Sequence, residues 1–191
     1  MKNATGEFMA RIDHDDIWYK DKLKIQVDFL VSNLDFDIIG SQAMYSIKTI
    51  SEKRDRLTKL PCSYMEIRQR FTYGNPFIHS AILLRASVIK DVGGYDERFK
   101  FAQDYELWSR ILQKSKGANL SVALCRLGID NGSISSKNAK SQRAFALYAK
   151  ILASKRLGFS LGFLRHFVKD AVFILSPKIL IHRLRNANRF S

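Results

Sequence analysis

The 191-residue sequence carries 32 lysines and arginines against 18 acidic residues, a net charge of +14, and 46% of its residues are hydrophobic. This composition excludes a disordered or low-complexity chain, and the length suits one main domain with a sizeable core. The two cysteines, Cys62 and Cys125, have no neighbouring residues at metal-binding spacing, so they indicate reduced thiols rather than a disulfide framework.

The excess positive charge is concentrated in the last third of the chain. Twelve basic residues but only one acidic residue, Asp170, lie from Lys137 onward. This asymmetry predicts an anionic partner, either nucleic acid or the negatively charged cytoplasmic leaflet of a membrane. The first residues lack the apolar core of a signal peptide, and no apolar run reaches the ~18 residues of a spanning helix. We therefore expect a cytoplasmic protein.

The first feature along the chain is an apolar run, residues 8–12, that leads into the carboxylates Asp13, Asp15 and Asp16. We predict a buried strand here, whose alternation would point Asp13 and Asp15 to the same side. Paired carboxylate oxygens suit Mg²⁺ or Mn²⁺, ions that keep open positions for water and phosphates. Helix capping is the alternative use of such a cluster.

Helical spacing then predicts a helix over residues 19–32, with Leu23, Val27 and Leu30 on one apolar face. The next part of the chain predicts short elements: strands at 38–40 and 42–47, an exposed loop at 51–59, a helix at 61–69, a strand at 77–85 and a helix at 86–91.

Gly93 and Gly94 allow positive φ angles or the close approach of a ligand, although a helix C-cap would use them equally well. A helix is predicted to open at Gln103, with Trp108 on its inner face. Asp104 then lies near the helix N-terminus, where it could be a capping residue or a functional one. A strand is predicted at 118–127.

The C-terminal part predicts a helix over 138–157 and a tail over 161–188 that Pro177 divides into two helices. One side of the tail is apolar, and Arg165 and Lys169 lie on the other. Such a basic amphipathic segment fits a helix lying in the membrane interface, and it fits an ordinary helix packed on the core equally well.

Three blocks, in the same order along the chain, resemble the family-two, inverting, GT-A-fold glycosyltransferases that build bacterial surface polysaccharides. Residues 5–16 look like the segment that ends in the DxD motif, residues 79–97 contain a GGYDE loop, and residues 101–110 resemble the ED segment. The resemblance implies an α/β fold: the C-terminal portion of a GT-A domain, with a Rossmann-like mixed sheet, over residues 1–135. A basic extension of amphipathic helices would follow over residues 136–191.

The resemblance also implies an activity, namely transfer of a sugar from a nucleotide-diphosphate sugar to a saccharide or lipid-linked acceptor with inversion. Asp104 would be the general base, and Asp13 and Asp15 would hold the divalent metal, Mn²⁺ or Mg²⁺. The implied donor-binding residues are Arg11, Asp13, Asp15 and Asp16, and the implied acceptor-binding residues are His79, Gly93, Gly94, Asp96 and Glu97. We assign Trp108 to core packing and Arg110 to a salt bridge.

The sequence departs from the family pattern in two places. Gln103 stands where the family usually has Glu, which removes a charge beside Asp104. In addition, a nucleotide-binding half normally precedes the DxD motif, and only twelve residues precede Asp13. We therefore expect a fragment, or a half that pairs with another chain, with unpaired strand edges. Residues 1–191 alone should transfer no sugar.

Three hypotheses follow. The first is a metal-dependent glycosyltransferase, or its catalytic half, that lies peripherally on the cytoplasmic face of the cell membrane. The second is a catalytically inactive remnant whose surviving property is peripheral membrane association through the basic tail. The third is a nucleic-acid binder, which charge alone suggests. Because the tail lacks interleaved aromatic stacking residues, we expect no nucleic-acid partner.

Overall fold

The computed structural model describes residues 4–48, 53–128 and 139–176. The elements, in chain order, are β1 (Phe8–Ala10), β2 (Ile17–Trp18), α1 (Lys22–Ser32), β3 (Phe36–Lys48), β4 (Lys53–Leu57), α2 (Tyr64–Phe71), the 3₁₀ turn η1 (His79–Ala81), β5 (Leu83–Arg85), α3 (Ala86–Asp91), α4 (Gln103–Ile111), β6 (Lys116–Arg126), α6 (Ala139–Leu157) and α7 (Leu161–Leu175).

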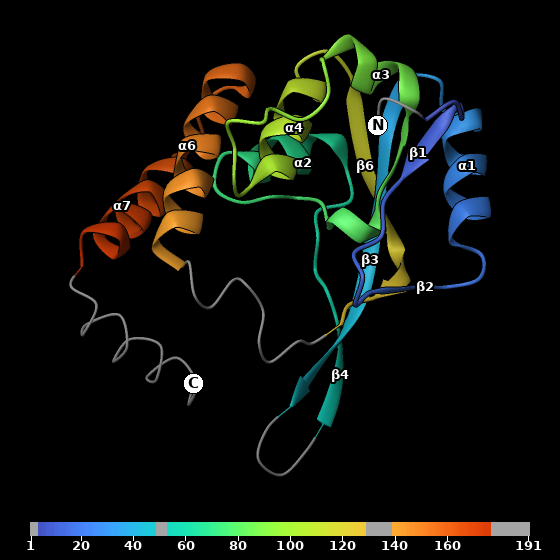
Figure 1. Ribbon diagram of the computed structural model, residues 1–191, viewed down its shortest axis with the longest axis horizontal. Coiled ribbons are helices and arrows are strands. Elements are labelled where there is room, and N and C mark those ends of the chain that lie inside the picture. Colours follow the sequence, from blue (N-terminus) through green and yellow to red (C-terminus); the bar gives the residue numbers. More distant parts are fainter. Residues whose placement is uncertain (1–3, 49–52, 129–138, 177–191) are drawn as a thin grey trace.

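A mixed sheet in the order β1-β5-β3-β6-β2 forms the centre of the fold, and β4 adds to β3 as a hairpin. Strands β3 and β6 are parallel, whereas the other pairs are antiparallel. Helix α1 lies on one side of the sheet, and α2, α4 and α6 lie on the other (Figure 1). The expected mixed α/β architecture is therefore confirmed.

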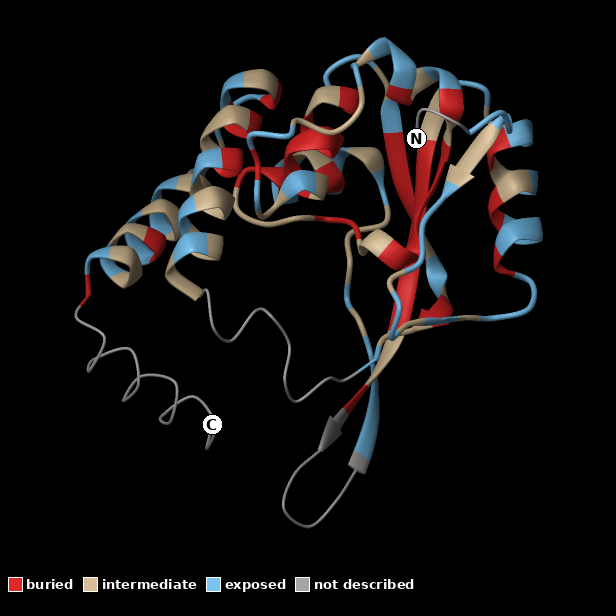
Figure 2. Cartoon of the chain, in the orientation of Figure 1, coloured by how far each residue is buried: buried red, intermediate tan, exposed pale blue. Residues whose placement is uncertain are grey.

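Alternation along β3 gives each face of the sheet its own core. Ile38, opposite Leu84, belongs to the larger core beneath α2, α4 and α6, and Ile39, opposite Leu83, belongs to the core beneath α1. Burial is densest along the central strands and the helix faces that cover them (Figure 2). The sheet is thus a two-sided support whose strand ends and loops carry the polar residues.

Helices α3 and α4 form where the sequence predicts them, and Trp108 of α4 is buried in the larger core, as expected. Ala149 and Ala153 of α6 are fully buried in that same core. Residues 129–138, which connect β6 to α6, lie outside the described residues, as does the tail beyond Ser176. The division of the chain at residue 135 stays a prediction.

Helix α1 buries two of the three residues predicted on its apolar face: Leu30 is fully buried and Val27 packs on the same core. Leu23, in contrast, is 44% exposed, and Lys22 and Gln26 are buried in addition. The two polar side chains are buried because backbone carbonyls accept their hydrogen bonds. Lys22 Nζ donates to the Ile82 oxygen at 3.1 Å, and Gln26 Nε2 donates to the carbonyl oxygens of Ile39 and Ala81.

Two further expectations were wrong. The predicted loop at 51–59 contains β4, which pairs with β3 from Met44 opposite Leu57 onward, so the two short strands predicted at 38–47 are one long strand. The predicted strand at 77–85 is a 3₁₀ turn followed by the three-residue strand β5.

Within the described residues, no helix is both long and apolar enough to span a membrane.

Candidate active site

The acidic cluster after β1 forms a tight turn. Strand β1 ends at Ala10, and the amide of Asp16 donates to the carbonyl oxygen of Asp13 at 3.1 Å. The expectation of a strand through residue 12 is therefore wrong. The turn, rather than strand alternation, sets the directions of Asp13 and Asp15.

Distant parts of the chain fix this turn on both sides. The amide of Asp13 donates to Ser80 Oγ at 2.9 Å, and the Gly128 amide donates to Asp16 Oδ1 at 2.8 Å. A side chain at Gly128 would place its Cβ 2.2 Å from the Asp15 carbonyl oxygen, so only glycine fits there. The turn is thus held between η1 and the end of β6.

The carboxylates of Asp13 and Asp15 are open to solvent, with 41% and 35% of their side chains exposed. Arg11 Nη2 lies 3.6 Å from Asp13 Oδ1, and His14 Nδ1 lies 3.8 Å from Asp15 Oδ1. In the described part of the chain, no three His, Cys, Asp or Glu residues gather into a metal site. Carboxylate oxygens are the kind of ligand that a hard cation such as Mg²⁺ takes, usually one or two of them together with phosphate oxygens of a substrate.

Asp104 lies in the first turn of α4, as predicted. Its Oδ2 accepts a hydrogen bond from Asn75 Nδ2 at 2.8 Å. Ala102, which precedes the helix, has a left-handed backbone with φ 56°, and no side chain caps this end of α4. The Asp104 carboxylate is therefore engaged by a loop residue.

His79 lies between the two acidic segments. Its Nε2 is hydrogen-bonded to the Tyr95 hydroxyl at 2.8 Å, and its Nδ1 lies 3.9 Å from Asp13 Oδ2. Burial lowers the pKa of His79, while the charges of Asp104 and Asp13 act in the opposite direction. The charges of both carboxylates therefore act on the pKa of this imidazole, although 91 positions separate the two residues in the sequence.

The paired glycines close helix α3 and also line a cavity. Gly93 and Gly94 have φ angles of 76° and 73°, and their amides donate to carbonyls of the last turn of α3. The two glycines, with Arg11, Tyr95 and Glu97, contribute to the wall of a cavity of about 690 Å³. These hydrogen bonds and positive φ angles confirm the C-cap, and the close approach of a ligand to the two glycines stays a prediction.

Arg110 links this glycine turn to α4. Its Nη2 donates to the Gly94 carbonyl at 2.7 Å and to Glu106 Oε2 at 2.7 Å, and its Nη1 donates to the Val92 carbonyl. Glu106 is buried and also accepts from Arg156 Nη1 of α6 at 3.0 Å. The salt bridge predicted for Arg110 is confirmed, and it supports the cavity wall.

The other predicted site residues are arranged differently. Asp96 turns toward Arg98, whose hydrogen bonds lower the pKa of that carboxyl to about 2. Asp15 and Asp16 lie on the Gly128 side of the acidic turn. The sequence interpretation assigned no role to three residues that contact the site: Asn75, Ser80 and Tyr95. Tyr95 falls within the GGYDE loop, whereas Asn75 and Ser80 are single polar residues without a comparable signal.

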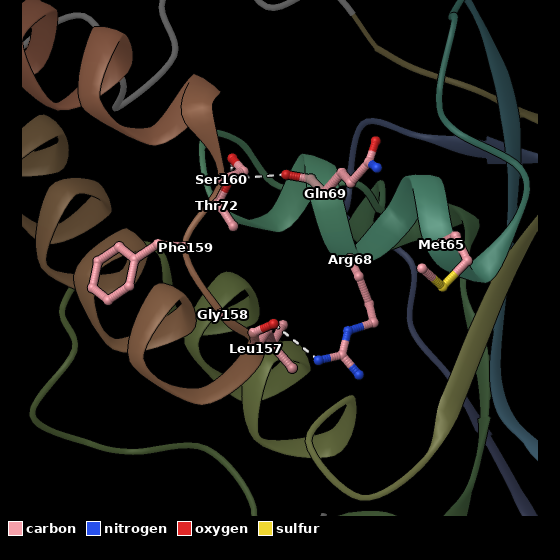
Figure 3. Close-up of a pocket in the computed structure, with 8 residues that line it drawn as sticks. All are labelled: Met65, Arg68, Gln69, Thr72, Leu157, Gly158, Phe159 and Ser160. Carbon is pink, nitrogen blue, oxygen red and sulfur yellow. Dashed lines mark hydrogen bonds between the residues drawn. The ribbon is translucent and has the colours of Figure 1, made fainter.

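A second cavity, of about 310 Å³, lies between α2 and the junction of α6 with α7 (Figure 3). Arg68 Nη2 donates across it to the Leu157 carbonyl at 2.9 Å, and the hydroxyls of Thr72 and Ser160 are hydrogen-bonded to each other. None of the predicted site residues lines this cavity. It belongs to the packing of the C-terminal helices on α2.

The mixed sheet and the acidic residues at its edge define an α/β protein with a polar site at the strand ends. A family model described as "Glycosyltransferase like family 2" matches residues 1–169, so the chain belongs to this glycosyltransferase family. It is similar to the amylovoran biosynthesis glycosyltransferase AmsE of Erwinia amylovora, with 25% identity over 94% of this chain and 67% of AmsE. The putative glycosyltransferase EpsE of Bacillus subtilis is 24% identical over 96% of this chain and 65% of EpsE.

Among solved structures, S. aureus TarS 1-349 aligns with 91% of this chain and 49% of its own, at a TM-score of 0.54 and 16% identity. This likeness shows the fold, which is GT-A-like as the sequence resemblance implied. The chain spans about two thirds of the length of AmsE and EpsE and about half of the TarS chain.

Proposed function

We propose that this chain supplies the metal-binding and acceptor-side part of an inverting glycosyltransferase. Its substrates would be a nucleotide-diphosphate sugar and a hydroxyl of a saccharide or lipid-linked acceptor, in surface polysaccharide or lipopolysaccharide biosynthesis. The observation that carries the proposal is that one short segment contacts both acidic parts of the site: Asn75 Nδ2 donates to Asp104 Oδ2 at 2.8 Å, and Ser80 Oγ accepts from the Asp13 amide at 2.9 Å. The name of AmsE, an amylovoran biosynthesis enzyme, supports the biosynthetic role.

In this proposal the donor lies against the acidic turn. Asp13 and Asp15 would hold a divalent cation, Mn²⁺ or Mg²⁺, and this ion supplies charge neutralisation to the departing nucleotide diphosphate. Asp16 shapes the turn through its bond to Gly128, and Arg11 adds a cation beside Asp13. Exposure of the two carboxylates leaves them accessible to a donor from solvent.

Asp104 would accept the proton of the acceptor hydroxyl as that oxygen attacks the anomeric carbon. A single displacement opposite the leaving group gives inversion. Burial lowers the pKa of His79, so its imidazole is neutral at pH 7. It therefore does not form an ion pair with either carboxylate. The cavity lined by Gly93, Gly94 and Glu97 would admit the acceptor, and Asp96 would hold its rim through Arg98.

The outward face of α7 supports a peripheral position on the cytoplasmic side of the cell membrane. Its exposed apolar residues recur at helical spacing and are 52–83% exposed: Leu164, Val168, Val172 and Leu175. Arg165 and Lys169 are exposed beside them. Asp170 is buried and bonded to Lys150, so its charge does not oppose an anionic surface. An apolar stripe flanked by cations suits a helix lying in an anionic interface.

Binding of Mn²⁺ in the presence of UDP tests the metal and donor assignments without requiring turnover. Electron paramagnetic resonance should show bound Mn²⁺ in the wild-type chain and at least about tenfold weaker binding in Asp13→Asn and Asp15→Asn. Asp28→Asn, which alters an exposed carboxylate of α1, should bind as the wild type does. Equal binding in all four proteins would contradict the proposal.

Turnover tests the base. Any consumption of a nucleotide sugar that the chain supports should fall by about 10²–10⁴-fold in Asp104→Asn. Unchanged turnover in this variant would remove Asp104 from the mechanism.

A further inference from the structure

One short segment, residues 75–80, contacts both acidic parts of the site. At one end Asn75 Nδ2 donates to Asp104 Oδ2 at 2.8 Å. At the other end Ser80 Oγ accepts from the Asp13 amide at 2.9 Å. The segment therefore sets the separation between the acidic turn and the first turn of α4.

The side chain of Asn75 is itself held in one orientation. Its Oδ1 accepts a hydrogen bond from the Phe77 amide at 3.1 Å, so its Nδ2 must be the group that faces Asp104. Phe77 is buried in the larger core and packs edge-on against Phe71, with ring centroids 6.4 Å apart. The donor that meets Asp104 is thus anchored to the core through only two residues of backbone.

We propose that Asn75 is a positioning residue for Asp104, an inference that rests on the proposed role of Asp104 as the general base. The side-chain amide of Asn75 donates a hydrogen bond to Oδ2 of Asp104, and no other hydrogen bond to this carboxylate comes from the parts of the chain that the structure describes. Oδ1 is consequently the oxygen that receives the proton of the acceptor hydroxyl. Fixing the carboxylate in this way prepares the geometry of attack before the acceptor binds.

The contact has a direct spectroscopic test in the intact chain. In ¹⁵N-labelled protein at pH 7, the side-chain amide signals of Asn75 should move when Asp104 is replaced by Asn, because the charged acceptor of Nδ2 is removed. The side-chain amide signals of Asn33, which donates to the Phe29 carbonyl at 2.8 Å, serve as the internal control and should not move.

Kinetics test whether the contact serves the reaction. Asn75→Asp keeps the shape of the side chain but replaces the donor with a second carboxylate. In a preparation in which the chain supports turnover, kcat should therefore fall at least about tenfold while KM for the donor stays unchanged. Asn75→Ala should give a smaller loss in kcat, and Asn33→Ala should give none.

The two proposals fail in different ways. The positioning role is wrong if the Asn75 signals do not move when Asp104 is replaced. It is also wrong if turnover is measurable and Asn75→Asp turns over as fast as Asn33→Ala. If the Asn75 signals respond but neither Mn²⁺ binding nor turnover depends on the acidic residues, the hydrogen bond stands and the glycosyltransferase mechanism does not.

Discussion

Arg156 of α6 donates a hydrogen bond from Nη1 to Oε1 of Glu106 in α4, at a distance of 3.0 Å. Glu106 also binds Arg110, whose other donors hold the carbonyls of Val92 and Gly94. One buried carboxylate therefore connects a C-terminal helix, the helix that carries Asp104, and the glycine turn of the cavity.

Replacing this carboxylate should destabilise the whole fold. Glu106→Gln leaves two arginines without their shared counter-ion in a buried place, so we expect a loss of about 3–5 kcal/mol in the free energy of unfolding, measured with urea. Glu7→Gln breaks an exposed pair with Arg85, 3.5 Å long, and should cost less than about 1 kcal/mol. Similar small losses in both variants would show that the Glu106 cluster is not a structural centre.

The outward face of α7 should bind anionic membranes. We expect the chain to sediment with phosphatidylcholine vesicles that contain phosphatidylserine, less so at high salt, and hardly at all with pure phosphatidylcholine. The double variant Leu164→Glu/Val168→Glu should partition about tenfold or more weakly, since it places charges in the apolar stripe.

Leu34→Glu is the matched control for membrane binding, because Leu34 is 79% exposed and directly follows α1 rather than lying on α7. Retained binding by the α7 double variant would exclude this face as the contact. Self-association of the wild type that the double variant abolishes, seen in sedimentation velocity without vesicles, would assign the stripe to a second copy of the chain instead.

Lys22 should make stability depend on alkaline pH. Burial lowers the pKa of Lys22 from 10.5 to about 8. Between these values the unfolded chain binds the proton and the folded chain does not, so the free energy of unfolding rises with pH through this window. The contribution should reach about 3 kcal/mol, measured as the difference between the wild type and Lys22→Met.

Burial raises the pKa of Cys125 to about 11, which lowers the free energy of unfolding as the pH rises and so opposes the effect of Lys22. Because Cys125 is present in both proteins, its contribution cancels in the difference. Lys20→Met, at an exposed lysine just before α1, should leave the pH dependence unchanged. If the difference in the free energy of unfolding between the two proteins did not change from pH 8 to pH 10.5, burial would not lower the pKa of Lys22 in the folded chain.

The sequence predicted best where apolar periodicity alone decides structure. Helix α4 was found because Trp108 and its apolar neighbours recur at helical spacing. The inner face of α1 was predicted only in part, through Val27 and Leu30. Lys22 and Gln26 could not be placed there, because they are buried by hydrogen bonds to the carbonyls of Ile39, Ala81 and Ile82, which are far away in the sequence. Strand β4 was missed for a similar reason: its charged residues form a strand only because β3 extends far enough to pair with them.

The candidate site divides in the same way. Asp13 and Asp104 stand out as carboxylates next to apolar segments, and resemblance to a family gave them roles. Asn75 and Ser80 carry no such signal, since a lone amide or hydroxyl in a loop is ordinary in any sequence. Only the folded geometry distinguishes them, because their partners lie 29 and 67 positions away.

The close fit of Gly128 against Asp15 and Asp16 bears on how the protein matures on the ribosome. The acidic turn is synthesised well before one of its walls, because 112 positions separate Asp16 from Gly128. Nascent chains that stop before β6 would carry the aspartates without the geometry that arranges them, so the proposed cation binding should arise only after translation has passed this glycine.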